Sequence, residues 1–438
     1  MSTSLTKEQQ IIRDLSDELI EAQREILILD AIKWGDDVKK DFFRNKFKKL
    51  PKVDKEYYQT RPLSYSPRQK KYRFYDLESK IQRRLGKLST IGQIMQRYCQ
   101  QYRMAMDMLM VRGLSTFSNI AQSLYGSARD VFYVGGPTIY ELAKLLDNQL
   151  PILQIQTTTS ADEKKYTAEQ AAKQLQHNLK SYFNDPKEKI TVEVSDTMIA
   201  DAAAGAECIR MRSDAMFSQR DIQLLEVHEG WVHLGTTLNG LNQPICTFLS
   251  KGPPACTVTQ EGLAVIMEIF TFSAFPARVS RIINRIIGID MAEHGANFLE
   301  VFHFYRERGH SEDDAYALTV RIFRGSTPTG GPFTKDLAYS KGFVQIYNYI
   351  RLAFKLGLTH NIPLLFVGKI VLEDLPLLAD LEDSGLLATP KYLPPQFKDL
   401  AALSSWMSFS LFMNQIDLAK LEKALKPLLR THPPEYPR

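Results

Sequence analysis

Two histidines and a glutamate in the segment HEGWVH are of the types that hold and use a metal ion. His228 and Glu229 are adjacent, and His233 follows five positions after His228. Hydrolytic zinc sites use imidazoles and carboxylates as ligands, leave one position open for water, and place a carboxylate where it can accept a proton. In the familiar zinc-protease helix the two histidines are four residues apart. The segment therefore has suitable residue types but one residue too many.

The extra residue sets a geometric condition on the helix. Five residues of an ideal α-helix rotate through about 500°, or about 140° past a full turn, so His228 and His233 would face different directions. A single π-type turn absorbs one extra residue, and such bulges are enriched at functional sites. Loosening of the helix before His233 would have the same effect, and Gly230 makes either change easier. The spacing therefore predicts an over-wide or broken helix between the two histidines.

A third candidate ligand follows in the segment TQEGLA. Glu261 lies 28 residues beyond His233, in the predicted first turn of a new helix that follows a Pro/Gly loop. Zinc sites with two histidines and one glutamate can take the third ligand from such a helix. The alternative is a helix-start carboxylate that the helix dipole favours. The residues alone leave both interpretations open.

The pair HEGWVH and TQEGLA resembles the flavohaemoglobin-expression-modulating family, which is named for its QEGLA motif. That family is similar to the microtubule-associated tyrosine carboxypeptidases, which remove the C-terminal tyrosine of α-tubulin, and both branches carry HExxxH followed by EGLA. The resemblance includes CIRMR and FRGSTPTGGPFTKDLAYSKG and covers roughly residues 75–390. The exact QEGLA sequence resembles the bacterial-type branch rather than the tubulin enzymes. The resemblance implies that His228, His233 and Glu261 bind Zn²⁺, that Glu229 is the general base, and that the fold is zincin-like, of the gluzincin type.

A carboxypeptidase also needs a cation for the terminal carboxylate of its substrate and a donor for the developing oxyanion. Arg210 and Arg212 share one face of a predicted strand, and they rank first as the cation. Tyr339 is the candidate donor. A surface cation and a core tyrosine are the structural alternatives for these roles. The further candidates for the cation are Lys335, Arg321 and Arg324.

Helices and a small sheet must position these residues. Strands are predicted at 152–156, 189–194 and 205–212, with a helix at 167–183 between the first two, as in a βαβ unit. The last strand, GAECIRMR, precedes the active-site helix, and we expect it to be the edge that pairs with extended substrate. Ser218 is the predicted N-cap of that helix, with help from Asp221.

Most of the remaining chain shows helical periodicity. Helices are predicted at 7–33, 76–112 with a break at Gly86, 116–125, 137–147, 259–274, 277–308, 311–323, 334–357, 361–370, 374–385, 396–412 and 416–429. The fold class is therefore α+β, mostly helical, with a small mixed sheet beside the active-site helix. The expected domains are an N-terminal helix and basic extension, 1–70, and a zincin-like catalytic domain, 71–438. The second comprises a helical part at 76–147, the sheet at 152–212, active-site helices at 218–274 and a C-terminal helical part at 277–438.

The net charge of +5 is unevenly distributed. Residues 38–87 hold 17 Lys and Arg against 5 Asp and Glu, a balance of +12, which leaves −7 for the rest of the chain. One interpretation is a surface for an acidic partner. The favoured one is a solvated basic extension laid over the core, because no nucleic-acid motif accompanies the charge. Nucleic acid is therefore not an expected partner.

The remaining composition bears on the compartment. The N-terminus is polar and lacks a secretory signal, and the chain has no run of about 18 apolar residues, so no membrane span is expected. The four cysteines form no CxxC pair and are too few for a disulfide scaffold. A reducing, cytoplasmic location fits these features best.

The residues and the resemblance together favour a zinc-dependent metallopeptidase. The expected activity is that of a carboxypeptidase that removes a C-terminal residue, such as tyrosine or another aromatic residue, from a protein or peptide. Glu229 would assist the attack of water. The alternative is a non-catalytic regulatory or binding protein that keeps the zinc site, with residues 38–87 engaging an acidic partner.

Overall fold

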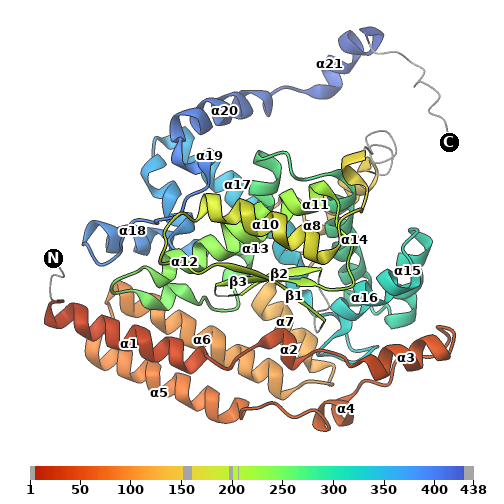
Figure 1. Ribbon diagram of the computed structural model, residues 1–438, viewed down its shortest axis with the longest axis horizontal. Coiled ribbons are helices and arrows are strands. Elements are labelled where there is room, and N and C mark those ends of the chain that lie inside the picture. The colour runs from red at the N-terminus through yellow and green to blue at the C-terminus, as the bar shows by residue number, and fades with distance from the viewer. Residues whose placement is uncertain (1–4, 151–159, 197–200, 206, 429–438) are drawn as a thin grey trace.

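Helices make up most of the structure, a computed structural model that describes residues 5–150, 160–196, 201–205 and 207–428 (Figure 1). The N-terminal helices are α1 (Lys7–Gln23), α2 (Ile28–Ala31), α3 (Asp36–Arg44), α4 (Lys55–Gln59), α5 (Pro67–Leu85), α6 (Thr90–Met110), α7 (Thr116–Tyr125) and α8 (Ile139–Asp147). The central elements are η1 (Ser160–Asp162), α10 (Ala168–Tyr182), β1 (Thr191–Ser195), β2 (Ala202–Ala204), β3 (Cys208–Arg212), α11 (Gln219–Leu225), η2 (Glu226–Leu234), α12 (Gly235–Leu241), η3 (Thr247–Ser250) and α13 (Cys256–Phe270). The C-terminal elements are α14 (Pro276–Glu293), α15 (Phe298–Glu307), α16 (Glu312–Phe323), η4 (Thr334–Leu337), α17 (Ala338–Leu356), η5 (Thr359–Phe366), η6 (Leu372–Asp374), α18 (Leu375–Asp383), α19 (Pro395–Lys398), α20 (Leu400–Met413), α21 (Leu418–Leu425) and η7 (Lys426–Leu428). This composition confirms a mostly helical α+β class, while the zincin-like fold stays a prediction.

The N-terminal helices are part of the main hydrophobic core. Leu15 and Leu19 of α1 are fully buried and belong to the same cluster as Phe74 of α5 and Leu263 of α13. Burial of such side chains on one face is what the apolar periodicity of α1 predicts. The domain boundary expected at residue 70 does not coincide with the end of an element, because it falls inside α5.

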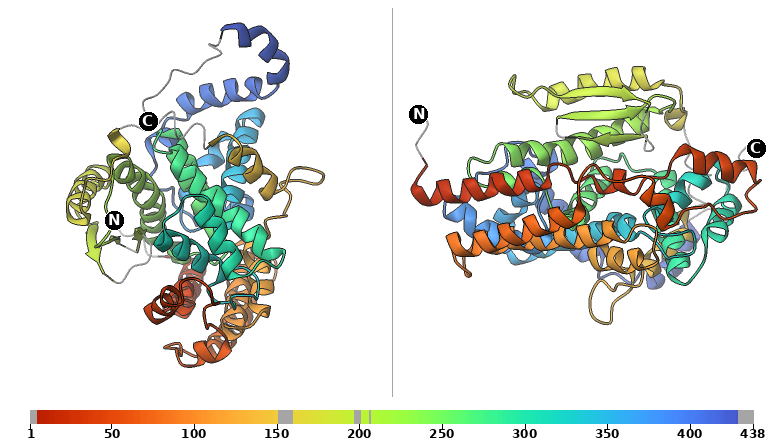
Figure 2. Two further views of the ribbon diagram at one scale, coloured as in Figure 1. Left: turned by 90° about the vertical axis from the view of Figure 1, so that its right-hand side faces the viewer. Right: turned by 90° about the horizontal axis from the view of Figure 1, so that it is seen from below.

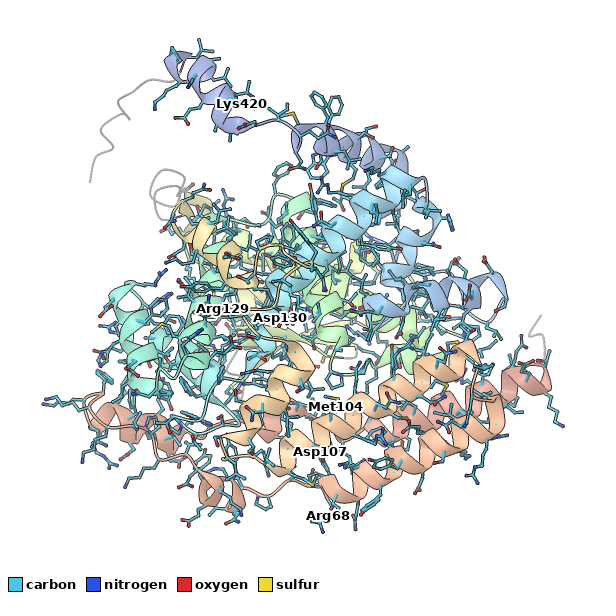
Figure 3. The ribbon with its side chains drawn as sticks, turned by 180° about the vertical axis from the view of Figure 1, so that it is seen from behind. Arg68, Met104, Asp107, Arg129, Asp130 and Lys420 are labelled. Atoms are coloured by element: carbon cyan, nitrogen blue, oxygen red, sulfur yellow. The ribbon has the colours of Figure 1, made fainter. Side chains whose placement is uncertain are left out.

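The basic segment, residues 38–87, folds into α3, α4 and α5, and several of its cations pair with acidic residues of the same chain. Lys71 Nζ lies 2.6 Å from Asp107 of α6, which is labelled in the view from behind in Figure 3. Lys39 Nζ lies 2.6 Å from Asp313. Phe42 is buried against aromatic rings of α15 and α16. The apolar side of this segment is thus built into the fold, and an acidic partner for it stays a prediction.

The sheet is small and mixed, and it corrects one expectation. Its strand order is β1-β3-β2, with β1 parallel and β2 antiparallel to β3. The segment GAECIRMR therefore supplies the central strand rather than the edge that we expected, because both its sides are taken by neighbours. The edge beside the active-site helix is β2, whose three alanines carry too weak a pattern for sequence prediction. The strand predicted at 152–156 lies outside the described residues.

The sheet and α10 lie together at one side of the molecule, next to the active-site helix (Figure 2). Side chains of α10, β3 and α11, including Leu179, Ile209 and Ile222, share one hydrophobic cluster. Gly230 of the active-site helix permits this contact, because a Cβ there would lie 2.4 Å from Leu179 Cδ2. The sheet is thereby held against η2.

Several helix predictions were wrong in detail. The helices expected at 7–33 and 396–412 are each divided, into α1 and α2 and into α19 and α20. The helix expected at 277–308 is two helices, α14 and α15, because Gly295 adopts a φ of +94° and Asn297 caps a new helix through the N–H groups of Leu299 and Glu300. Glycine past a helix end and asparagine at a helix start are typical of such breaks. The helix expected at 361–370 is the 3₁₀ segment η5, which contains Pro363.

Helices α13 and α17 cross at very short range. A Cβ on Gly262 would lie 2.3 Å from the carbonyl carbon of Gly342, and one on Gly342 would lie 2.0 Å from the carbonyl oxygen of Val258. Only glycine allows two helix backbones to approach so closely. This crossing fixes α13, and with it Glu261, against the body of the protein.

The C-terminal helices α20 and α21 extend away from the body (Figure 1). Leu403 and Met407 of α20 are buried, whereas α21 has no buried residue. Over the described part of the chain, no helix is both long and apolar enough to cross a membrane.

Candidate metal centre

The segment between the two histidines is a π-helix, as the five-residue spacing predicts. Ser218 caps α11 by accepting a hydrogen bond from the N–H of Asp221, and the Asp221 carboxylate accepts from the N–H of Ser218. The helix then widens over Glu226–Leu234 and returns to α geometry in α12. The imidazole rings of His228 and His233 have centroids 4.8 Å apart and lie nearly perpendicular, at 85°. The wide turn thus brings both imidazoles to one side.

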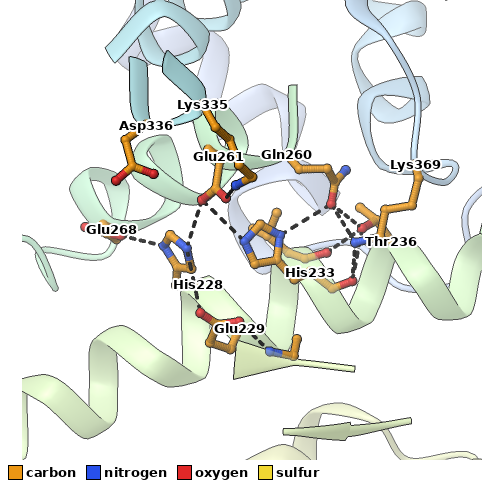
Figure 4. A network of polar contacts seen from close by, with 12 residues as sticks. His228, Glu229, His233, Thr236, Gln260, Glu261, Glu268, Lys335, Asp336 and Lys369 are labelled. Atoms are coloured by element: carbon orange, nitrogen blue, oxygen red, sulfur yellow. Dashed lines mark hydrogen bonds and ion pairs between the residues drawn. The ribbon is translucent and has the colours of Figure 1, made fainter. Parts of the chain in front are cut away.

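Glu261 faces both imidazoles from α13 (Figure 4). Its Oε2 lies 3.4 Å from His228 Nε2 and 3.6 Å from His233 Nε2. Its other oxygen, Oε1, lies 3.5 Å from Lys335 Nζ. Because α13 begins at Cys256, Glu261 is in the second turn rather than the predicted first turn, which removes the interpretation as a helix-start carboxylate.

These three atoms fit a zinc ion. Two ligands about 2.05 Å from a tetrahedral zinc are about 3.3 Å apart, close to the separations of Glu261 Oε2 from both imidazole nitrogens. Glu261 Oε2 is also buried without a well-formed hydrogen bond from any described residue, although buried carboxylate oxygens usually have a partner. A cation between these atoms would supply that partner.

The electrostatics of the site also favour a cation. Burial alone would lower the pKa of His228, but contacts with Glu261 and Glu268 and the charge of Glu229 raise it to about 10. Burial alone would raise the pKa of Glu261, yet Lys335 and the two histidines hold it well below its usual range. Glu261 therefore stays ionised while buried, which a metal ligand must do.

Glu229 lies on the opposite side of the imidazoles from Glu261, next to β2. Its Oε1 is 3.9 Å from His228 Nε2, and its Oε2 accepts a 2.8 Å hydrogen bond from the backbone N–H of Ala204. Potential ligand atoms of His228, Glu229 and His233 all lie within 4.8 Å of one another. Glu261 is nearer to both nitrogens than Glu229 is to His228, so Glu261 is the better candidate for the third ligand, and the role of Glu229 as base stays a prediction.

The family model of microtubule-associated tyrosine carboxypeptidases matches residues 40–415, which include every element of this site. The chain belongs to this family. No curated protein matches the chain. The match confirms the resemblance seen in HEGWVH and TQEGLA, and membership of the microtubule-associated tyrosine carboxypeptidase family suggests a carboxypeptidase-like activity.

In this member of the tyrosine carboxypeptidase family, each letter of the QEGLA segment has a structural role. Glu261 faces the imidazoles, and Gly262 makes the close crossing with α17. Leu263 and Ala264 are fully buried in the main core. Gln260 Oε1 lies 3.4 Å from His233 Nδ1. The segment thus combines a candidate ligand, its support and its packing in five consecutive residues.

Partners of the two imidazoles were missed by sequence reasoning. Glu268 Oε1 lies 2.6 Å from His228 Nδ1, and Arg278 donates to both oxygens of Glu268 at 2.9 and 3.2 Å. Gln260 Oε1 also accepts 2.8 Å bonds from the Thr236 hydroxyl and from Lys369 Nζ. Such partners orient ligating histidines and leave the other ring nitrogen for the metal. The available signal was the seven-residue spacing of Glu261 and Glu268, which places both on one face of α13.

Replacing Glu268 by glutamine should weaken zinc binding by about ten- to a hundredfold, because a carboxylate that orients a ligating histidine also raises its basicity. Competition with a chromogenic chelator measures the affinity. The matched control is Glu226→Gln. Glu226 lies in the π-helix that carries His228, but its carboxylate accepts a 2.7 Å hydrogen bond from the side chain of Asn178. Equal affinities for the wild type and Glu268→Gln would show that this contact does not support a metal ligand.

The two cations that rank first for substrate binding, Arg210 and Arg212, lie away from the metal centre. Arg210 is exposed and 3.8 Å from Glu193, and Arg212 pairs with Asp201 and Asp214 at 2.8 and 2.9 Å. Both lie on the face of β3 opposite Ile209 and Met211, which are buried in the hydrophobic cluster beneath the sheet. The structure therefore does not bring Arg210 or Arg212 to the histidines, because strand alternation turns them away from the buried face toward nearby acidic side chains.

The other two predicted residues do lie at the centre. Lys335 contacts Glu261, as described above. The ring of Tyr339 is nearly parallel to that of His228, at 29°, with centroids 6.3 Å apart. Burial and the charge of Glu261 raise the pKa of Tyr339, so its hydroxyl keeps its proton. Tyr339 can therefore act as a hydrogen-bond donor.

Proposed function

We propose that this protein is a zinc-dependent carboxypeptidase in which His228, His233 and Glu261 hold the metal. The observation that carries the proposal is the position of Glu261 Oε2, 3.4 and 3.6 Å from the two Nε2 atoms, across a π-helix that serves to bring those atoms together. Family membership supports the carboxypeptidase class. Bound zinc would supply Lewis-acid chemistry, polarising a carbonyl and acidifying water.

Glu229 is the proposed general base. Its carboxylate lies beside the metal-facing nitrogen of His228, within reach of a water molecule that attacks the scissile carbonyl. The hydrogen bond from the N–H of Ala204 holds one oxygen in place and leaves the other to accept a proton. The same oxygen can then pass the proton to the leaving amine. Tyr339, a protonated phenol beside His228, is the proposed donor to the oxyanion.

The proposed strand for substrate pairing is β2, in place of β3. Strand β2 is the edge of the sheet that contacts the active-site helix, and the backbone of Ala204 already bonds to Glu229. An extended peptide laid along such an edge would bring its carbonyl to the proposed base.

The proposed substrate class is a protein or peptide C-terminus. The family is named for tyrosine removal, so peptides ending in tyrosine are the first to test, followed by phenylalanine and acidic ends. Release of the last residue by the zinc-loaded protein, measured by mass spectrometry, is the expected result. Full zinc loading without release from any peptide would contradict the proposal and favour the alternative of a regulatory protein that keeps a zinc site.

A further inference from the structure

A group of buried and partly buried cations lies near Glu261 and Tyr339. It comes from three elements of the C-terminal half: α14, the end of α16, and η4. The members are Arg278, Arg285, Arg321, Arg324 and Lys335. Charges this well buried are rare unless each has a partner. The five cations differ in how well each is paired.

Two of the arginines are fully paired. Arg278 forms a fork with both oxygens of Glu268. Arg321 forms another with Asp336, at 2.8 and 3.0 Å. These bidentate contacts occupy the two carboxylates and are the strongest arrangement that arginine makes.

Arg285 and Arg324 are not paired in this way. Each is only 9% exposed. Arg285 Nε lies 3.6 Å from the carboxylate that Arg321 already occupies, and its Nε and Nη1 are buried without a hydrogen-bond partner. Arg324 Nε is also buried without a hydrogen-bond partner, and no described acidic group forms an ion pair with Arg324. Burial and the charge of Arg321 lower the pKa of both groups, that of Arg324 to about 10.

The Arg285 guanidinium lies about one aromatic ring from the metal centre. The Arg285 guanidinium is 5.4 Å from the centre of the Tyr339 ring, whose centre is 6.3 Å from that of His228. Arg324 lies over the Phe333 ring, close enough to Asp336 for its charge to help lower the pKa of that carboxyl. The scissile carbonyl carbon of the penultimate residue and the terminal carboxylate carbon are linked through one N and one Cα, so they lie within about 4 Å of each other. One residue can therefore span the two sites.

We propose that Arg285 and Arg324 bind the terminal carboxylate of the substrate. The inference rests on the proposed carboxypeptidase function and names the group that this function recognises: a free α-carboxylate on the residue to be removed. The planar guanidinium groups of the two arginines suit a carboxylate, and the incoming anion supplies hydrogen-bond acceptors that the folded chain does not give to their buried N–H groups. Arg210 and Arg212, at the far face of the sheet, have no part in this role.

The test measures binding separately from turnover. Zinc-loaded Glu229→Gln protein is titrated by calorimetry with N-acetyl-L-tyrosine and with N-acetyl-L-tyrosinamide, which lacks the carboxylate. The acid should bind at least about tenfold more tightly than the amide, because hydrogen bonds to charged groups are the stronger ones. Adding Arg285→Met or Arg324→Met should weaken acid binding by about ten- to a hundredfold and leave amide binding unchanged.

Matched variants separate recognition from structure. Arg212→Met should leave both titrations unchanged. Arg285→Met and Arg324→Met should keep or raise the midpoint of thermal unfolding, since each removes a buried charge that has no hydrogen-bonded carboxylate, whereas Arg321→Met should lower it by leaving Asp336 without its bidentate partner. Arg285→Lys keeps the charge without the fork and should recover only part of the acid binding.

The outcomes distinguish this inference from the proposed function. Equal or undetectable binding of acid and amide to the parent protein would overturn it, as would variants that lose both ligands and stability together. Selective acid binding without hydrolysis by the wild type would contradict the proposed function and leave the carboxylate site standing. Cleavage of free and amidated peptides at equal rates would keep a peptidase and remove the carboxylate site.

Discussion

Replacing Glu229 by glutamine is expected to lower kcat by about a hundred- to ten-thousandfold, the usual contribution of a positioned base. The glutamine carbonyl can still accept the hydrogen bond from Ala204, so the local geometry should persist while the proton acceptor is lost. Zinc content should remain that of the wild type, because Glu229 is not a proposed ligand. The measurements are the rate of C-terminal residue release and the zinc content of the same preparation.

Glu226→Gln is the control for the Glu229 experiment. Glu226 lies three residues before Glu229 in the same π-helix, and its carboxylate contacts Asn178 rather than the imidazoles. Its activity should stay close to that of the wild type. If Glu229→Gln keeps activity within about threefold of the wild type, the loss is too small for a general base, and Glu229 does not have that role.

Replacing His233 by alanine is expected to remove zinc and activity together. His233 supplies one of three proposed ligand atoms, and its loss leaves His228 and Glu261 as a two-residue site. The fall in zinc affinity should exceed the ten- to hundredfold that the loss of a supporting partner such as Glu268 produces. Metal analysis after dialysis, together with the hydrolysis assay, measures both effects.

A surface histidine provides the comparison for His233→Ala. His294 caps the end of α14, with its side chain 59% exposed, and its Nδ1 contacts the backbone carbonyl of Asp290. His294→Ala should keep wild-type zinc content and rate. A His233→Ala protein that still holds one zinc per chain would show that the metal is bound elsewhere.

The local features of the site follow from sequence, because they depend on neighbouring residues. The phase error between His228 and His233 on an α-helix predicts the π-helix, and the pattern of Ser218 and Asp221 predicts the helix start. Both are set within a few turns of one helix. The family resemblance supplied Glu261, whose separation in sequence carries no geometry by itself.

The contacts between distant segments could not be predicted in the same way. In the sequence Arg285 looks like an ordinary helix residue and Arg324 is one of several candidate cations, and only the fold shows that Asp336 is already occupied by Arg321. The edge strand β2 was missed because a run of alanines has no alternating pattern. Arg210 and Arg212 were placed on the correct common face of a strand, but the side on which the site lies depends on tertiary packing.

The most direct test of the metal site is anomalous diffraction at the zinc edge from crystals of the wild-type protein loaded with one equivalent of zinc. We expect a single strong peak between His228 Nε2, His233 Nε2 and Glu261 Oε2, with the π-helix retained. A peak elsewhere, or no peak among these three atoms, would contradict the central claim that the extra residue in HEGWVH serves to build a metal site.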